Sequence, residues 1–441
     1  CRAANSEHPA VLSTQNCPSS PCPAQSGLPP TARSHSIKIV MPQTQNIRRL
    51  GVLTAFPPSR NSLNEFGFHL VNHLAANDAV ESVVVFADET DAGEPIELDD
   101  NAEKVENVVC WSFNSLTNPI KIMRAVRKAK IDALIVNLQF ATFGDSKIAG
   151  GLGLLAPALV KKMGVPTAVV LHNLVDKVDM KDAGFTDSEV VACFMNKAGR
   201  ALTHVILRTD YVALTIPRYV EFLIESYGAD NALLAPHGSF DEIAEPSFGV
   251  PVGGPRRILA FGKWGTYKTV DILVEAVRDL GTRGYDDLEL VIAGTDSPNA
   301  AGYLQGVADS CTDMDNVVFT GYVAERDVEP LFSGSAVTAF PYTSTTGSSG
   351  VLHQAGSYGR SAVLPAIGDF IEVIEEEGFV GVYFEPGSAR GLADAIAQLL
   401  DDDELNAEHG RRNYLAATGV PMADIIDWHL IHLNRVAADG R

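Results

Sequence analysis

The feature that most constrains this chain is an alternation of short apolar runs with amphipathic stretches, which begins at Arg49. The runs are rich in β-branched residues and are typical of strands buried on both faces of a parallel sheet. In the first half they are RLGVLTAF, ESVVVF, NVVCW, DALIVN, PTAVVLH, HVILR and ALLAP, with helical patterns at Leu63–Ala76, Pro119–Lys130 and Leu152–Met163. Strands that alternate with helices predict a doubly wound α/β sheet.

The alternation stops once and then starts again. The segment EPSFGVPVGGP, residues 245–255, has three prolines and three glycines and is typical of a linker. The runs RRILAF, LELVIAG, NVVFTG, AVTAF, SAVLPA and GVYF follow it. We therefore predict two Rossmann-like domains, over residues 48–246 and 247–418, and a final helical segment over residues 419–441. A chain of 441 residues is also too long for one ordinary core.

The N-terminal segment differs from the rest of the chain. Residues 1–47 are rich in Pro, Ser, Gln and Asn and have no apolar periodicity, so we predict a disordered tail. Met41, followed at once by PQTQNIRRLGVLTAF, is an alternative start, and the residues before it would then be non-native. The segment has no apolar core of a secretory signal, and we expect a cytoplasmic protein.

The charge balance limits the partners. A formal net charge of −21 argues against a nucleic acid or an anionic membrane held by bulk charge. One predicted helix is basic and could touch a membrane surface as a peripheral contact, although the solvated face of a Rossmann helix is the simpler interpretation. Its cations are Lys121, Arg124, Arg127, Lys128 and Lys130.

The first strand-to-helix loop of the second domain is FGKWGTYKTV. Ligands of open α/β sheets bind beyond the carboxyl ends of the strands. Gly262 stands at the predicted strand end, Lys263 and Lys268 are five residues apart, and an amphipathic helix follows. Two ammonium groups beside a helix N-terminus would neutralise a diphosphate. Two solvated surface lysines are the alternative.

A glycine- and serine-rich loop, TSTTGSSGVLHQAG, follows the strand AVTAF and precedes a helix predicted over Val351–Tyr358. The backbone N–H groups of Thr346, Gly347, Ser348 and Ser349 would converge at that helix start and bind phosphate. A flexible turn with an ordinary N-cap is the alternative. The loop has neither the GKS or GKT of a Walker A motif nor the GxSxG spacing of a nucleophile elbow.

Three features of the first domain face the expected cleft. His172 ends the strand AVVLH, and His237 precedes the linker as a hinge contact. The loop FPPSRNSLNEFGF carries Arg60, Asn61 and Asn64, which could reach an acceptor. A structural role is the alternative for His172. No HxH, HExxH or DxD constellation stands out for a catalytic metal, and no Ser/His/Asp set can be assembled from spacing alone. Two Rossmann-like domains with an anion-binding wall fit a transferase that uses a nucleotide-diphosphate substrate.

Several segments match one known family in order and spacing. They are FGKWGTYKTVDILVEA, LELVIAGTD, NVVFTGYV, AVTAFPYTST and GFVGVYFEPGSARGLADAIAQLLDD and, more loosely, VLHN and LLAPHGSF. From about Leu50 onward the chain resembles the family-4 retaining glycosyltransferases of the GT-B fold. The resemblance implies two domains facing across a cleft and a final helix, around Trp428, that crosses back to the first domain. It also implies a UDP- or GDP-linked sugar as donor, a sugar, glycan or lipid-linked acceptor, and no cofactor or metal.

The resemblance also implies roles for particular residues. Lys263 and Lys268 would hold the donor diphosphate, His172 would lie beside the transferring sugar, and the main chain at Tyr322–Val323 would meet the nucleobase. In such enzymes the leaving phosphate oxygen takes the acceptor's proton on the same face, so a hexose is transferred with retention.

The chain departs from the family at its acidic pair. Thr346 and Gln354 stand where the family usually has two glutamates. Gln354 can hydrogen-bond a ribose without charge assistance, and Thr346 offers a hydroxyl and a main-chain N–H. A sugar phosphorylase of the same fold is one alternative function. A non-catalytic sugar-nucleotide-binding protein, motivated by the missing acidic pair, is another.

Overall fold

The structure is a computed structural model that describes residues 47–59, 61–90, 101–174, 189–239, 244–297, 300–344 and 349–439. For residues 189–196, 325 and 369 it describes the backbone alone. Residues 43–441 form one compact unit. The tail predicted over residues 1–47 lies outside the described residues, except for Ile47.

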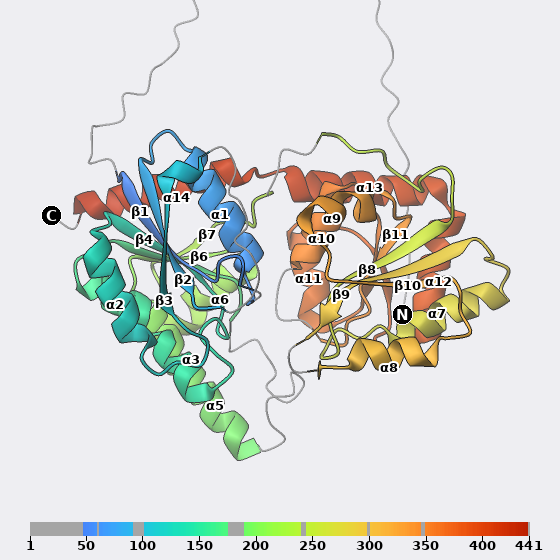
Figure 1. The fold of residues 1–441 in the computed structure, drawn as a ribbon, viewed down its shortest axis with the longest axis horizontal. Helices are drawn as coiled ribbons and strands as arrows, with labels where there is room; N and C mark the ends of the chain where they lie inside the picture. The colour runs from blue at the N-terminus through green and yellow to red at the C-terminus, as the bar shows by residue number, and fades with distance from the viewer. Residues whose placement is uncertain are drawn as a thin grey trace, which may run out of the picture. The chain divides into compact units, whose positions relative to one another are not determined.

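In the described residues the first sheet has seven parallel strands in the order β3-β2-β1-β4-β5-β6-β7 (Figure 1). The strands are β1 (Arg49–Leu53), β2 (Ser82–Asp88), β3 (Val105–Trp111), β4 (Ala133–Leu138), β5 (Thr167–Leu171), β6 (Tyr211–Leu214) and β7 (Ala232–Leu234). The chain runs from β1 to β3 at one edge, returns to β4 and continues to β7 at the other edge. β1 and β4 therefore lie side by side at the point where the strand order reverses.

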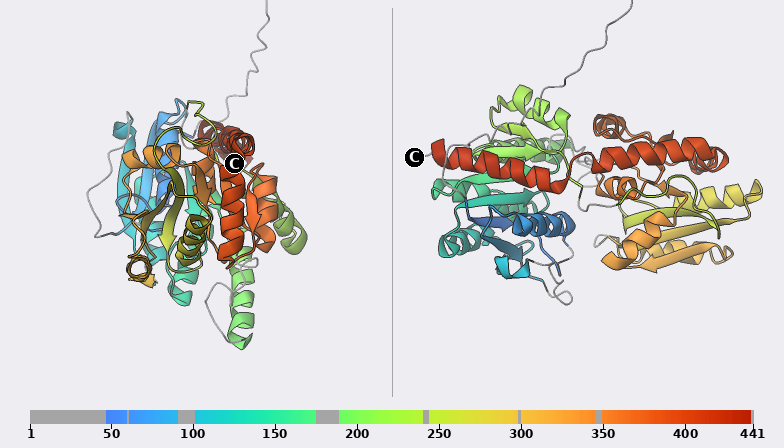
Figure 2. Two further views of the ribbon diagram at one scale, coloured as in Figure 1. Left: turned by 90° about the vertical axis from the view of Figure 1, so that its right-hand side faces the viewer. Right: turned by 90° about the horizontal axis from the view of Figure 1, so that it is seen from above.

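Helices cover both faces of this sheet. On one face α1 (Asn64–Ala76) and α14 (Met422–Asp439) share a core with β1 and β2, and on the other α2 (Asn118–Ala129), α4 (Ala156–Lys162) and α6 (Pro217–Tyr227) do so. The remaining helices are η1 (Ala102–Lys104), α3 (Lys147–Gly153) and α5 (Glu189–Ile206). The C-terminal helix α14 buries Met422, Ile426 and Leu433 against the first sheet, so the predicted crossing helix is confirmed (Figure 2).

The second sheet has six parallel strands in the described residues, in the order β10-β9-β8-β11-β12-β13. The strands are β8 (Arg256–Trp264), β9 (Leu288–Asp296), β10 (Val317–Gly321), β11 (Val337–Ala339), β12 (Ala362–Pro365) and β13 (Val382–Phe384). The helices are α7 (Asp271–Thr282), α8 (Tyr303–Ser310), α9 (Glu325–Ser333), α10 (Gly350–Ser357), α11 (Gly368–Glu376), α12 (Ala389–Asp401) and α13 (Asp403–Thr418).

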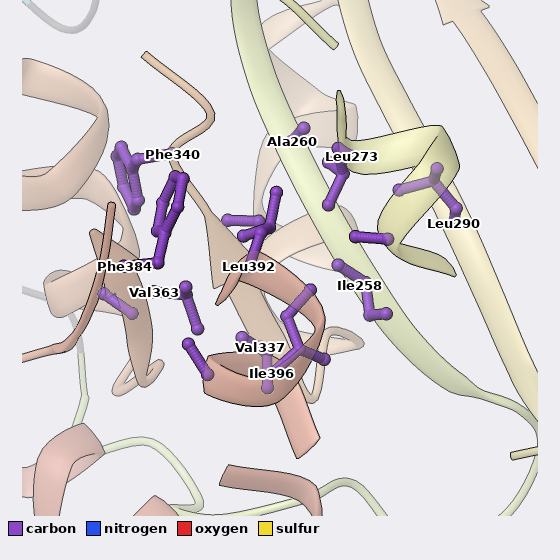
Figure 3. Close-up of a cluster of buried hydrophobic side chains, with 14 of the residues drawn as sticks. Ile258, Ala260, Leu273, Leu290, Val337, Phe340, Val363, Phe384, Leu392 and Ile396 are labelled. Atoms are coloured by element: carbon purple, nitrogen blue, oxygen red, sulfur yellow. The ribbon is translucent and has the colours of Figure 1, made fainter. Parts of the chain in front are cut away.

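The core of the second sheet lies between its strands and two helices. Figure 3 shows Leu273 of α7 and Leu392 and Ile396 of α12 packed against Ile258 and Val363 of the sheet. On the opposite face α9 and α10 pack through Phe332 and Ala355. We call the first sheet with its helices the first lobe, and the second sheet with α7–α13 the second lobe.

The predicted α/β fold with two parallel sheets is confirmed, and three local predictions are wrong. HVILR is not a strand: it starts in the last turn of α5, and the strand is β6. A short apolar run does not distinguish a strand from a buried helix segment. The helix predicted over Leu152–Met163 is split between α3 and α4, where Pro157 stands in the first turn of α4. Gly262 does not end β8, which continues to Trp264. The domain boundaries at residues 246 and 418 stay predictions.

Candidate functional site

Two glycines shape the carboxyl ends of the central strands of the second lobe. Gly262 and Gly294 are paired in the β8–β9 ladder, with φ of 154° and 112°. A Cβ atom on Gly294 would lie 1.8 Å from the carbonyl oxygen of Gly262. Only residues without a side chain allow this approach. The carboxyl ends of β8 and β9 therefore approach each other closely at these glycines. Because Gly262 has no side chain, the space beside it is open to other groups.

Lys268 reaches into that space. Its Nζ and Cδ atoms lie 3.8 Å from the position that a Cβ atom on Gly262 would take. The ammonium group stands 4.5 Å from the centroid of the Tyr342 ring and 5.8 Å from that of Tyr267, within the range of a cation–π interaction. Tyr342 is 2% exposed, so its ring is a rigid support. These contacts hold the Lys268 ammonium group beside the glycine.

Backbone hydrogen bonds join the loop that carries Lys268 to the segment that precedes the glycine–serine loop. Lys268 and Tyr342 form an antiparallel β-bridge. Thr343 N–H donates to the Tyr267 carbonyl at 2.8 Å, and Thr269 N–H donates to the Pro341 carbonyl at 3.3 Å. The two loops that the sequence singled out are therefore neighbours.

Lys263 has a different setting. It is exposed and follows Gly262 on β8, whereas the next residue, Trp264, is fully buried and donates its indole N–H to the Ala293 carbonyl at 3.0 Å. Because successive side chains of a strand leave opposite faces, Lys263 leaves the face opposite to Trp264.

The glycine–serine loop is described only at its end. Thr346, Gly347 and Ser348 lie outside the described residues. Ser349 is the N-cap of α10, and its hydroxyl accepts a hydrogen bond from Leu352 N–H at 3.4 Å. The hydroxyl of Ser349 therefore acts as an ordinary N-cap. Gln354 lies half-buried on the same helix.

The predicted nucleobase contact lies after β10. Tyr322 is 65% exposed, and Val323 packs against the same small buried cluster as Val351 of α10. The turn after β10 is therefore held beside the helix that carries Gln354.

In the first lobe His172 lies beside the carboxyl end of β4. Asn137, at the end of that strand, uses its amide nitrogen on Thr54 Oγ1 at 2.9 Å and on the Leu63 carbonyl at 3.1 Å. Its oxygen therefore faces His172 Nε2 at 2.8 Å, and Nε2 must carry the proton. Burial lowers the pKa of His172 to about 4, so the ring is neutral at neutral pH and its Nδ1 is an acceptor.

The predicted acceptor loop is organised by a buried carboxylate. Asp88, 2% exposed at the end of β2, accepts from Phe56 N–H at 3.1 Å and from the Asn61 amide at 2.6 Å. The Asn64 amide donates to the Ser59 carbonyl at 2.9 Å. Both amide nitrogens therefore shape the loop. Arg60 lies outside the described residues.

A series of rings joins His172 to α10. The ring centroids of His172 and His237 are 6.3 Å apart, and those of His237 and His353 are 4.6 Å apart. Burial and the neighbouring rings of His353 and His172 lower the pKa of His237. His353 precedes Gln354 on α10, so His237, the predicted hinge contact, lies between His172 and α10.

Sequence reasoning missed Asn137, Asp88, Tyr342 and His353. Asp88 and Tyr342 follow predicted strands, and His353 is next to Gln354 in the sequence. Asn137 is the polar residue that ends the apolar run DALIVN, and this position could have identified it. In the described part of the chain, no group of three or more His, Cys, Asp or Glu residues could hold a metal ion. No helix within those residues is long and apolar enough to cross a membrane.

One family model matches part of the chain. Residues 255–402, from β8 to α12, match the family model described as "Glycosyl transferases group 1". No curated protein sequence matches the chain significantly.

The fold is similar to that of three solved structures at low identity. Sucrose-phosphate synthase from Thermosynechococcus elongatus has a TM-score of 0.64 and 16% identity over 88% of this chain and 98% of that one. The Anabaena protein Alr3699/HepE, in complex with UDP and glucose, has a TM-score of 0.59 and 15% identity over 87% and 98%. The UDP-forming α,α-trehalose-phosphate synthase from Burkholderia xenovorans, in complex with glucose-6-phosphate, has a TM-score of 0.60 and 11% identity over 88% and 100%.

The family match and the fold together indicate a transferase of the glycosyltransferase class with the GT-B fold. The matched segment contains Lys263 of β8, Lys268 of the β8–α7 loop and the whole of α10.

Proposed function

We propose that this protein transfers a hexose from a UDP- or GDP-linked sugar to a hydroxyl acceptor, with retention at the anomeric carbon. The observation that carries the proposal is the Lys268 ammonium group held against Tyr342 above Gly262, on a loop paired with the segment that precedes α10. The nucleotide-bound and sugar-phosphate-bound fold neighbours support a nucleotide donor and a sugar acceptor.

The donor diphosphate lies beside Lys268 and Lys263, with its oxygens toward the start of α10. As the bond between the anomeric carbon and the phosphate oxygen breaks, negative charge grows on the diphosphate. Lys268 and the helix N-terminus stabilise that charge. The acceptor oxygen bonds to the anomeric carbon on the same face, and its proton passes to the leaving phosphate oxygen.

The remaining residues orient the two substrates. Gln354 bonds the ribose, and Thr346 with Gly347, Ser348 and Ser349 bonds donor oxygens through the main chain. Neutral His172 accepts a hydrogen bond from a sugar hydroxyl at Nδ1, because its Nε2 proton is committed to Asn137. The main chain at Tyr322–Val323 meets the base. Arg60, Asn61 and Asn64 contact the acceptor.

The replacement of the usual acidic pair favours a second candidate, a non-catalytic protein that binds a sugar nucleotide. One experiment separates the two functions. The purified protein is screened by thermal shift against UDP, GDP, ADP and their sugars, and then assayed for nucleotide release with candidate acceptors. A ligand at 100 times its Kd stabilises the native state by about 2.7 kcal/mol.

The decisive variant is Lys268→Ala, with exposed Lys162→Ala on α4 as the matched control. We expect Lys268→Ala to lower turnover on the order of 100-fold or more and to weaken nucleotide binding, with an unchanged circular dichroism spectrum. Near-normal turnover in Lys268→Ala would sink the assignment. Nucleotide binding by the wild type without turnover on any acceptor would favour the non-catalytic protein.

A further inference from the structure

A cationic face covers the outer side of α2, in a chain that is otherwise strongly acidic. Five cations lie on and just after this helix, and all are exposed: Lys121, Arg124, Arg127, Lys128 and Lys130. The opposite side of α2 buries Ile122 and Val126 against the first sheet. Helical spacing gathers residues 121, 124, 127 and 128 on one side. From Asn107 to Ile131 the sequence contains no Asp or Glu.

Exposed apolar side chains gather at the N-terminal end of the same helix. They are Phe113, Leu116, Ile120 and Ile148, which are 41%, 60%, 49% and 70% exposed. We call these four residues the apolar tip. Three separate segments contribute to it: the loop after β3, the first turn of α2 and the start of α3 (Figure 1).

Hydrogen bonds hold the three segments together. The side chain of Asn118, in the first turn of α2, accepts from Ser112 N–H at 3.1 Å and donates to the Ser112 carbonyl at 2.8 Å. Asn114 donates to Asp145 at 2.6 Å and accepts from Ser146 N–H at 2.9 Å, two residues before Ile148. The apolar tip is therefore a built surface beside the cationic face.

We propose that the cationic face of α2 and the apolar tip form a docking surface for an anionic lipid bilayer. Cations attract acidic headgroups, and adjacent apolar side chains enter the boundary between headgroups and acyl chains. A nucleic acid would use the cations but not three exposed aliphatic side chains. Two acids beside these segments, Asp145 and Glu89, accept hydrogen bonds from Asn114 and Ser112. The net charge of −21 means that the rest of the chain is acidic on balance and opposes binding to an anionic surface.

The proposal does not depend on the proposed transfer, because binding is measured without turnover. The full chain is sedimented with vesicles of phosphatidylcholine, with and without phosphatidylglycerol, at low and at raised salt. We expect binding to the anionic vesicles alone, weakened by salt. Each cation near the surface contributes about fivefold to the partition coefficient, so Lys121→Glu/Arg124→Glu/Lys128→Glu should lose about 100-fold or more.

Two matched controls separate the site from bulk properties. Arg326→Glu/Arg390→Glu/Arg412→Glu makes the same charge change at exposed positions of the second lobe. Leu415→Ser/Ile431→Ser removes exposed apolar side chains elsewhere and is compared with Leu116→Ser/Ile148→Ser. We expect both control variants to retain most of the binding and Leu116→Ser/Ile148→Ser to lose most of it.

A second readout covers variants that fold poorly. Phe113→Trp adds a tryptophan at the apolar tip, and its emission should shift to the blue when anionic vesicles are added. The proposal is overturned if the wild type does not bind anionic vesicles, or if the control triple variant loses as much binding as the α2 variant. It is also overturned if Phe113→Trp binds without an emission shift, or if duplex DNA competes with the vesicles for the face.

Discussion

The aromatic support under Lys268 makes a sharp prediction about Tyr342. Replacing Tyr342 with Leu removes the ring that stands 4.5 Å from the ammonium group, whereas Phe keeps it. A cation–π interaction of this kind is worth about 0.5–2 kcal/mol. If that energy positions Lys268 for the diphosphate, Tyr342→Leu lowers kcat/KM for the donor by about 2- to 30-fold.

The assay compares the two variants in steady-state nucleotide release with a saturating acceptor. The kcat/KM of Tyr342→Phe should lie close to that of the wild type. Burial raises the pKa of Tyr342, so the hydroxyl that is removed is neutral and adds no charge beside Lys268. Tyr342→Leu loses packing in the core of the second lobe, whereas Tyr342→Phe loses only the hydroxyl, so the urea unfolding midpoints of both variants are measured separately.

The refuting result comes from a double-mutant cycle. In a Lys268→Ala background the substitution Tyr342→Leu should have no further effect on kcat/KM, because the group that it positions is gone. If the two losses add, or if Tyr342→Phe and Tyr342→Leu are equally impaired, the ring does not act through Lys268.

Three further predictions concern stability. Gly294→Ala should cost about 2–4 kcal/mol in urea unfolding, because its Cβ meets the Gly262 carbonyl at a positive φ. Arg360 is 1% exposed and donates to the carbonyls of Ser247, Gly249 and Ser335, so Arg360→Leu should cost about 3–5 kcal/mol by orphaning them; a loss under about 1 kcal/mol would contradict this. Burial lowers the pKa of His429 to about 3 from 6.5, so the folded state binds fewer protons than the unfolded state. Its stability contribution is therefore complete above about pH 6.5 and is lost as the pH falls toward 3, and His429→Gln should flatten that slope in pH-dependent unfolding; an unchanged slope would refute it.

Much of the fold follows from the sequence, because local periodicity encodes burial. The runs from RLGVL to VYF predict both parallel sheets, since each buried strand reads as a continuous apolar segment. Apolar periodicity gives the wrong element at HVILR, which begins in the last turn of α5, because a short apolar run alone does not distinguish a strand from a helix. The final helix was visible as an amphipathic pattern, and its packing against the first sheet needed the resemblance or the structure.

The candidate site divides in the same way. The sequence alone singled out the charged residues, which are Lys263, Lys268 and the cations of α2, but it placed the end of β8 too early, at Gly262. Only the tertiary structure decided that Thr343 bonds to Tyr267, 76 residues away, and so brings the Tyr342 ring beneath Lys268. It also decided that Asn137 fixes the tautomer of His172. The physical reason is that spacing along the chain specifies the burial of an element, whereas contacts between distant segments depend on how the elements pack.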